Sequence, residues 1–270
     1  MSVPLKKSVL GIGVSVTSYG EVLRVCAQWI EERRAAGGSQ LPARYAAILN
    51  VHSVMTGVLD SSFRAVLNGA DLGTSDGMPL VWALRWLGAR GQRRVYGPDL
   101  MLALCGQAAR LGHRIFLYGG REETLAQLGE LLRTRFPNLS IAGAYSPPFR
   151  RLTPEEDAAC MARICASGAD LAFVGIGAPK QERWMAEHKA KMPGVVMLGV
   201  GAAFDFHCGR VRQAPGWMQR AGLEWLFRLY MEPGRLWRRY VLLNPLFVIL
   251  WSLQMTGILR YDLISKEQNT

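Results

Sequence analysis

The chain has 270 residues, of which 50% are hydrophobic and 20% are charged, with 32 Lys and Arg against 21 Asp and Glu and a formal net charge of +11. These values exclude a disordered chain and a polytopic membrane protein, and they fit one sizeable hydrophobic core or two modest ones. The positive excess predicts an anionic partner, for which nucleic acid, an acidic membrane surface and a phosphorylated small molecule are the candidates.

The cysteines and histidines indicate neither a disulfide framework nor a structural zinc site. There are five cysteines and four histidines, and no Cys-x-x-Cys pair. We therefore expect reduced thiols in the core and no bound metal. The N-terminal stretch MSVPLKKSVLGIGVSVTSYG has only a short apolar run and no cleavage site, so we expect a cytoplasmic protein.

Short apolar runs alternate along the chain with amphipathic stretches, a pattern typical of βαβ units around a parallel sheet. The predicted strands are residues 9–13, 45–49, 72–75, 114–118, 140–144, 171–175 and 195–200. The predicted helices are residues 19–34, 78–87, 99–111, 122–135, 154–166 and 179–191. Residues 1–205 are therefore expected to form an α/β, Rossmann-like parallel-sheet core.

The composition changes near residue 205, and residues 206–270 are expected to form a helical appendage. Seven arginines, three tryptophans and no lysine lie between His207 and Tyr240, and residues 240–259 carry no charge. About 20 apolar residues suffice to span a bilayer, but Asn244-Pro245 should break the helix. We favour a helix that lies in a membrane interface over a true span, and a helix buried in a dimer interface is the alternative.

Polar groups follow three predicted strands, where parallel sheets bind their ligands. Asn50 follows one strand, Asp76 another, and the third runs into Gly175-Ile176-Gly177-Ala178-Pro179-Lys180-Gln181. Glycines let a ligand approach the backbone, and a helix N-terminus attracts an anion. Each feature also has a structural reading: a helix cap for Asp76, a turn for Asn50, and a tight strand-to-helix turn for Gly175 and Gly177.

Several ordered motifs strongly resemble one family. They are the D-G at Asp76, R-V-x-G-x-D-L from Arg94, G-x-G-A-P-K-Q-E from Gly175, G-V-G-A-x-F-D-F-x-x-G from Gly199, and L-E-W-x-x-R-L-x-x-E-P-x-R-L-x-R-R-Y from Leu223. Over about residues 45–245 the chain resembles the WecG/TagA/CpsF family of bacterial glycosyltransferases. The resemblance implies inverting transfer of a sugar from a UDP-sugar to a polyprenyl-diphosphate-linked saccharide on the cytoplasmic membrane face. It implies no essential metal and no cofactor.

The resemblance also implies roles for individual residues. Asp76 corresponds to the general base, and Asn50, Arg94 and Gln181 correspond to other active-site residues. The structural reading of Arg94 is a solvated surface charge. The family commonly has threonine where this chain has Ile48, which leaves the donor open among N-acetylmannosamine, its uronic acid and glucose.

A second group of residues is expected to bind the substrate. It comprises Gly175, Gly177, Lys180, Asp205, Arg228, Arg235 and Arg238. The chain has no Asp-x-Asp carboxylate pair for a divalent ion, so arginine is expected to supply the positive charge on the diphosphate. The last three arginines would share one helix face if the helix were uninterrupted, although Pro233 bends the run.

Three other functional classes are compatible with parts of the sequence. A dehydrogenase is disfavoured because the first turn, G-I-G-V-S-V, lacks the third glycine of the dinucleotide fingerprint. A nucleic-acid binder is disfavoured because the arginines lie beside an uncharged apolar stretch. A non-enzymatic, membrane-docking Rossmann-like scaffold is the alternative to the transferase, and a homo-oligomer is left open.

Overall fold

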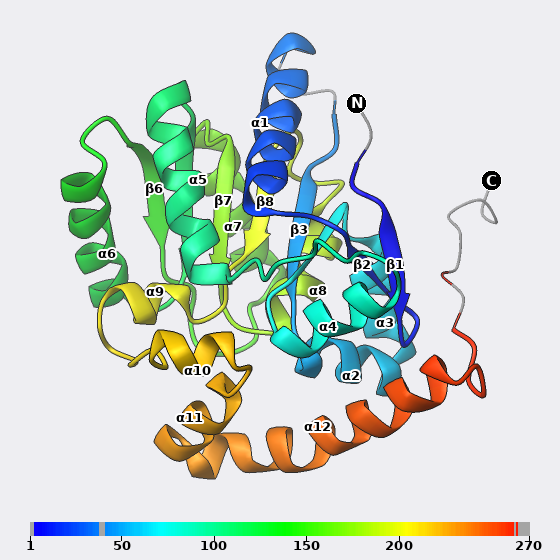
Figure 1. Cartoon of the computed structure of the whole chain (residues 1–270). Helices are drawn as coiled ribbons and strands as arrows, with labels where there is room; N and C mark the ends of the chain where they lie inside the picture. The colour runs from blue at the N-terminus through cyan, green and yellow to red at the C-terminus, as the bar shows by residue number, and fades with distance from the viewer. Residues whose placement is uncertain (1–2, 38–40, 262, 264–270) are drawn as a thin grey trace. The chain divides into compact units, whose positions relative to one another are not determined.

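The computed structural model describes residues 3–37, 41–261 and 263, with the side chains of Arg235 and Arg239 outside the description. Within this range the chain forms a six-stranded parallel sheet of order β4-β3-β8-β7-β5-β6, flanked by helices, and a separate two-stranded sheet (Figure 1). The predicted α/β class is confirmed. The chain divides into two compact units, residues 1–17 with 49–94 and 214–270, and residues 18–48 with 95–213.

The second unit is built on the parallel strands. They are β3 (Arg44–Leu49), β5 (Arg114–Gly119), β6 (Ser140–Tyr145), β7 (Leu171–Gly175) and β8 (Val196–Gly199). Strand β7 pairs with β5 on one side and β8 on the other. It is buried over its first four residues, as expected of a strand that reads as a continuous apolar run. Each of these strands lies within one residue of its predicted bounds.

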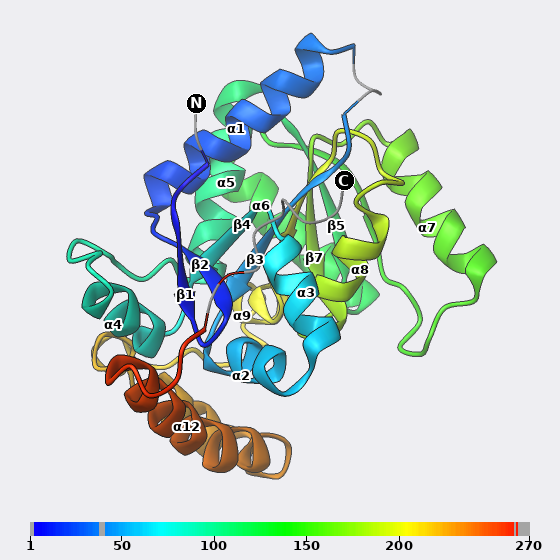
Figure 2. The ribbon, with the colours of Figure 1, turned by 90° about the vertical axis from the view of Figure 1, so that its right-hand side faces the viewer.

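Helices cover both faces of this sheet. Helices α1 (Tyr19–Ala35) and α5 (Gly97–Leu111) lie on one face, and α7 (Pro154–Ala166) and α8 (Lys180–His188) lie on the other (Figure 2). The unit also contains α6 (Glu122–Arg135) and α9 (Ala203–His207). Helix α7 begins with a capping box between Thr153 and Glu156, as its sequence predicts.

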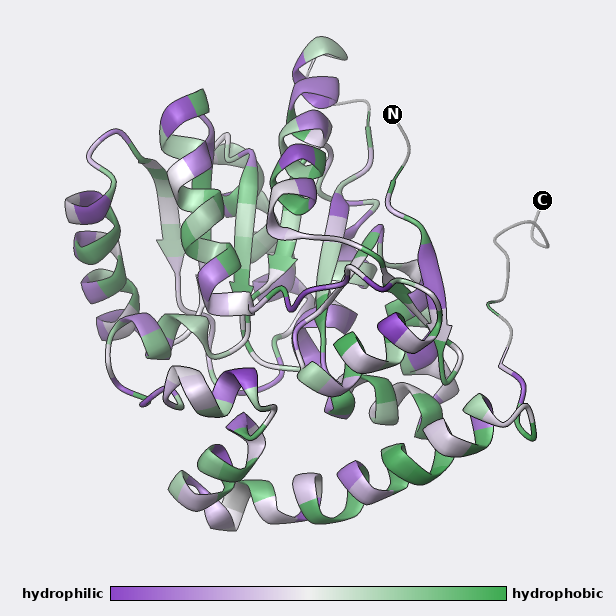
Figure 3. Ribbon diagram, in the orientation of Figure 1, coloured by the Kyte–Doolittle hydropathy of each residue, from purple (hydrophilic) through white to green (hydrophobic). Residues whose placement is uncertain are grey.

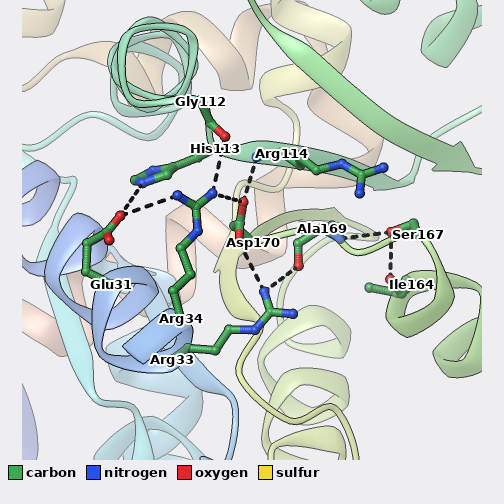
Figure 4. A network of polar contacts seen from close by, with 10 residues as sticks. All are labelled: Glu31, Arg33, Arg34, Gly112, His113, Arg114, Ile164, Ser167, Ala169 and Asp170. Atoms are coloured by element: carbon green, nitrogen blue, oxygen red, sulfur yellow. Dashed lines mark hydrogen bonds and ion pairs between the residues drawn. The ribbon is translucent and has the colours of Figure 1, made fainter. Parts of the chain in front are cut away.

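A polar network fastens the end of α1 to the sheet at the start of β5 and β7. Asp170, which is 4% exposed, accepts hydrogen bonds from Arg33 at 3.2 Å and from Arg34 at 2.9 Å. It also accepts one from the backbone N–H of Arg114 at 2.8 Å (Figure 4). A buried carboxylate needs such partners because its charge is costly to desolvate. This network lies at the N-terminal ends of β5 and β7, and Gly175 lies at the opposite end of β7.

The first unit begins with an antiparallel hairpin of β1 (Lys6–Val9) and β2 (Ile12–Ser15). The prediction of one parallel strand over residues 9–13 is wrong. Val9 pairs with Ile12, and the two residues between them, Leu10 and Gly11, have φ of +53° and +81°. Positive φ at both positions is typical of the tight turn that joins two twisted strands. The chain therefore reverses in the middle of the apolar run.

The rest of the first unit combines one strand with several helices. The elements are α2 (Val51–Leu59), α3 (Ser61–Gly69), β4 (Leu72–Ser75), α4 (Met78–Trp86), α10 (Gly216–Arg220), α11 (Glu224–Met231) and α12 (Pro233–Met255). Strand β4 has its predicted bounds, and α4 ends one residue before its predicted end. Helix α12 packs along α2.

Helix α12 is continuous, so the predicted break at Asn244-Pro245 is wrong. Pro245 lies inside the helix. The end of the helix is fastened to the hairpin, because the Gln254 side chain accepts from the Leu10 N–H at 2.8 Å and donates to the Ser8 carbonyl at 2.9 Å. Among the described residues, no helix combines the length and hydrophobicity needed to cross a membrane.

Most of the cysteines are core residues, as predicted. Cys26, Cys105, Cys160 and Cys208 are buried, and burial raises the pKa of both Cys26 and Cys105 to about 12. Cys165 is exposed, so the expectation of a core thiol is wrong there. It lies on α7 one residue after the buried Ile164, where the helix turns its outer face to solvent.

Candidate active site

Asp76 directly follows β4 and precedes α4. Its backbone N–H donates to the Leu49 carbonyl at 2.8 Å, which fixes the turn at the end of the strand. The N-cap residue of α4 is Gly77, and α4 has no side-chain cap. The reading of Asp76 as a helix cap is therefore wrong, and its carboxylate contacts a different group.

That contact is with Arg94. The guanidinium Nη2 lies 2.8 Å from Asp76 Oδ1, Nε lies 3.1 Å from the same oxygen, and Nε also donates to the Asp76 carbonyl. The Arg94 side chain is 16% exposed and that of Asp76 17%. The reading of Arg94 as a solvated surface charge is therefore wrong. The strand-end carboxylate is held by a half-buried cation.

Arg94 also contacts a second carboxylate, which the sequence analysis missed. Glu224, the first residue of α11, places Oε2 at 2.5 Å from Arg94 Nη2, and its side chain is 17% exposed. Gln219 of α10 accepts a longer hydrogen bond from Nη1 at 3.5 Å. Burial by itself lowers the pKa of Arg94, but the charges and hydrogen bonds of Asp76 and Glu224 outweigh it and raise that pKa above its ordinary value.

Asn50 stands at the start of α2 and has a clear structural role. Its Oδ1 accepts from the Ser53 N–H at 3.1 Å, and the Ser53 hydroxyl accepts from the Asn50 N–H at 2.8 Å. This reciprocal capping box satisfies two backbone donors of α2. Asn50 therefore has a structural role as the N-cap of α2 rather than in a turn, and a contact with the sugar stays a prediction.

The predicted row of arginines is divided between two helices. Glu232, with φ of −136°, separates α11 from α12. Arg228 is half-buried on α11. Because the later arginines lie on a separate helix, α12, Arg228 does not share a helix face with them. Arg238 is exposed on α12, with its guanidinium carbon 5.4 Å from the centre of the Trp237 ring. Arg235 lies in α12, and its side chain is outside the described part of the structure.

In the second unit, Gly175 and Gly177 shape the turn from β7 into α8. A Cβ on Gly175 would lie 2.7 Å from the Phe204 ring, so only glycine fits there. Gly177 has φ of +82°, and a Cβ there would meet open space. Lys180 is exposed at the first position of α8. The turn is tight, as the structural reading holds, and it leaves the backbone at Gly177 open to a ligand.

Gln181 and Glu182 form a buried polar pair beside the end of β8. They are 4% and 1% exposed. Gln181 Nε2 donates to Glu182 Oε1 at 2.8 Å, and Gln181 Oε1 accepts from the Gly201 N–H at 3.0 Å. Gln181 is thus held in place on the loop after β8. Glu182, which the sequence analysis did not single out, is its direct partner.

Two further features of the second unit bear on ligand binding. Asp205 is half-buried in α9, and its carbonyl accepts from the Arg210 N–H at 2.9 Å. An open cavity of about 590 Å³ lies at the end of β6, with Arg121, Tyr145 and Phe149 among its lining residues. Within the part of the chain that is described, no group of three or more His, Cys, Asp or Glu could hold a metal ion.

The sequence was compared with models of known families. The model described as the glycosyl transferase WecG/TagA/CpsF family matches residues 7–260. This range includes Asp76, Arg94 and Glu224 in the first unit and Gln181 in the second.

Proposed function

The chain belongs to the WecG/TagA/CpsF family of glycosyltransferases, and from that premise we propose that it moves a sugar from a UDP-sugar to a polyprenyl-diphosphate-linked saccharide. Membership makes it a glycosyltransferase of cell-surface polysaccharide synthesis. We propose an inverting hexosyl- or N-acetylhexosaminyltransferase of class EC 2.4.1. The donor sugar is N-acetylmannosamine, its uronic acid or glucose.

The pair of Asp76 and Arg94 is the observation that carries the mechanism. Inverting transfer requires a base that takes the proton of the acceptor hydroxyl while its oxygen attacks the anomeric carbon. The bond from that carbon to the diphosphate oxygen breaks, and UDP leaves with the electron pair. Asp76 is assigned as the base. Arg94, at 2.8 Å, holds its carboxylate in the ionised form that can accept the proton.

Other residues are assigned to substrate binding. Gln181 and Asn50 are assigned to the sugar hydroxyls, since amides both donate and accept hydrogen bonds. The exposed Lys180 and the open backbone at Gly177 are assigned to a phosphate, because the N-terminus of α8 favours an anion. Gly175 and Asp205 are assigned to the nucleotide. The cavity at the end of β6 is large enough for a nucleoside, and Tyr145 there offers an aromatic face.

Arginines of the appendage are assigned to the leaving group. As UDP departs, negative charge grows on its diphosphate, and a guanidinium can pair with two phosphate oxygens at once. Arg228, Arg235 and Arg238 are given this role, in place of a divalent metal. The contact between these arginines and the diphosphate speeds the reaction only to the extent that it is stronger in the transition state than in the ground state.

We place the protein on the inner face of the bacterial cytoplasmic membrane, where a lipid-linked acceptor lies. Helix α12 exposes five large apolar side chains, Trp237, Val241, Leu242, Val248 and Ile249, and the second half of the helix is strongly hydrophobic (Figure 3). The exposed Arg220 of α10 suits an anionic lipid surface.

Turnover of a UDP-sugar tests the proposal. The purified chain is incubated with each of the three donors and a lipid-linked saccharide, and release of UDP is measured. We expect turnover with one donor, and we expect Asp76→Asn to lower kcat by roughly 10²-fold or more with UDP affinity retained, because the amide keeps the shape and cannot take the proton.

Asp99→Asn is the matched control, since Asp99 is an exposed carboxylate on α5 and should leave kcat unchanged. The assay is repeated with EDTA, which should leave turnover intact. Absence of turnover with every donor would favour the non-enzymatic scaffold. Full activity of Asp76→Asn would remove Asp76 as the base.

A further inference from the structure

We propose that Glu224 is a positioning residue that shares the Arg94 guanidinium with Asp76 and thereby keeps Asp76 basic enough to accept a proton. The inference rests on the proposed function, because it assigns a role within that reaction. The observation behind it is that one nitrogen, Arg94 Nη2, contacts Asp76 Oδ1 at 2.8 Å and Glu224 Oε2 at 2.5 Å.

A base and a salt-bridge partner make opposite demands on Asp76. A guanidinium in contact with a carboxylate stabilises the ionised form and so weakens the carboxylate as a proton acceptor. A second carboxylate on the same nitrogen divides that attraction and adds a like charge nearby. Both effects raise the proton affinity of Asp76 above the value it would have with Arg94 alone. The three side chains together carry a net charge of about −1, given their ordinary ionisation.

The contact is well shielded from solvent. The side chains of Arg94 and Glu224 are 16% and 17% exposed, so water screens their charges less than at the open surface. The shortness of the Glu224 contact and the raised pKa of Arg94 agree with a strongly paired cation. The charge of Glu224 is therefore close enough and buried enough to change the strength of the attraction between Arg94 and Asp76.

The position of Glu224 also links the appendage to the base. Glu224 begins α11, and Gln219 of the preceding α10 reaches the other terminal nitrogen of Arg94. The other titratable side chains of α2, α4, α10 and α11 are His52, Arg85, Arg220, Arg228 and Tyr230. A substitution at Glu224 leaves all five in place.

Glu224→Gln tests the role because glutamine keeps the size and removes the charge. We expect kcat to fall about three- to tenfold and the acidic limb of the kcat/KM profile to move to lower pH, since Asp76 becomes the weaker base. Glu232→Gln is the matched control: it removes the same charge at the junction of α11 and α12 and should leave the profile unchanged. Glu224→Asp keeps the charge and should restore part of kcat and the position of the limb.

A merely structural role for Glu224 would give a different result. Loss of the α11 contact alone would lower kcat and the thermal unfolding temperature without moving the acidic limb. That outcome overturns the inference. A lower kcat in Glu232→Gln with the same displaced limb would also overturn it, because the effect would then be one of net charge.

A second readout separates this inference from the proposed function. In protein labelled with ¹³C at the aspartate carboxyls, the signal of Asp76 is assigned by its absence in Asp76→Asn, and its titration needs no turnover. We expect the midpoint to lie lower in Glu224→Gln than in the unsubstituted chain. An unchanged midpoint overturns the role of Glu224, whether or not any UDP-sugar is turned over. A lowered midpoint without turnover keeps the coupling and removes only the proposed reaction.

Discussion

Asp170 shows how much one buried carboxylate can hold together. It pairs with Arg33 and Arg34 from the end of α1 and accepts the Arg114 N–H at the start of β5. We expect Asp170→Asn to lower the free energy of unfolding by about 2–4 kcal/mol, because it leaves two arginines beside a neutral amide. Urea denaturation, followed by circular dichroism, measures the change.

The neighbouring Glu31 provides the control for this prediction. Its side chain is 61% exposed and contacts Arg34 at 3.5 Å and His113 Nε2 at 3.2 Å. Glu31→Gln should change the free energy of unfolding by no more than about 0.5 kcal/mol, since exposed ion pairs contribute little. Equal effects of the two substitutions would show that burial does not set the strength of this network.

Single residues of the candidate site differ in how far the sequence could predict them. Asp76 and Arg94 stand in motifs that mark a strand end and a family pattern, so both were identified. Glu224 was not, because its partner Arg94 is 130 positions away and local spacing holds no information about such a pair. Glu224 does stand in the motif L-E-W-x-x-R that begins at Leu223, but the motif does not indicate which residue it contacts.

Strands and helices could be predicted where burial sets the pattern of apolar residues in the sequence. The strands of the second unit are apolar runs of four to six residues, and their bounds were found to within one residue. The hairpin was missed because the first of its two turn residues is Leu10, a position with positive φ that glycine or asparagine usually occupies. Leu10 is fully buried, and burying a leucine is worth about 2 kcal/mol or more, which outweighs a cost of about 1–2 kcal/mol for the left-handed backbone.

The continuity of helix α12 through Pro245 could not be predicted from the sequence composition alone. Pro245 was expected to end it, but the packing of the helix along α2 and the fastening of Gln254 to the hairpin hold it through that residue. Tertiary contacts thus offset the hydrogen bond that a proline removes, a cost of about 3 kcal/mol. The sequence shows the proline, but it does not show that the helix packs against α2 and the hairpin.

The exposed face of α12 leads to a prediction at the scale of the helix. Val248 is 60% exposed, and Val248→Asp places a charge in its apolar surface. We expect binding to vesicles that contain anionic lipid to weaken by roughly tenfold or more, because about 1.5 kcal/mol of apolar burial is lost and the new charge is repelled. Flotation of the protein with the vesicles measures the binding.

Ala159→Asp adds the same charge at an exposed position of α7 and should leave flotation unchanged. If both variants lose binding equally, net charge governs the association. If neither does, α12 contacts something other than lipid, and light scattering would then test a dimer interface.

At the scale of the whole molecule, the first unit is assembled from three separate stretches of chain. Residues 214–270 supply Glu224 to Arg94, Gln254 to the hairpin, and Trp251, whose ring centre is 5.9 Å from that of Trp86. We therefore expect deletion of residues 214–270 to destabilise residues 1–17 and 49–94. Limited proteolysis with mass spectrometry should show early cleavage there in the truncated chain and not in the full one. Equal resistance in both chains would contradict the interdependence of the three stretches.

The bond between the Leu10 N–H and Gln254 sets an order of events during synthesis. The two residues are 244 positions apart. At translation rates of about 5–20 residues per second, the hairpin emerges roughly 10–50 s before its partner has been made. The hairpin therefore completes its hydrogen bonds to Gln254 only after residue 254 has been made. During that interval the Leu10 N–H and the Ser8 carbonyl lack the partner that Gln254 provides in the folded chain.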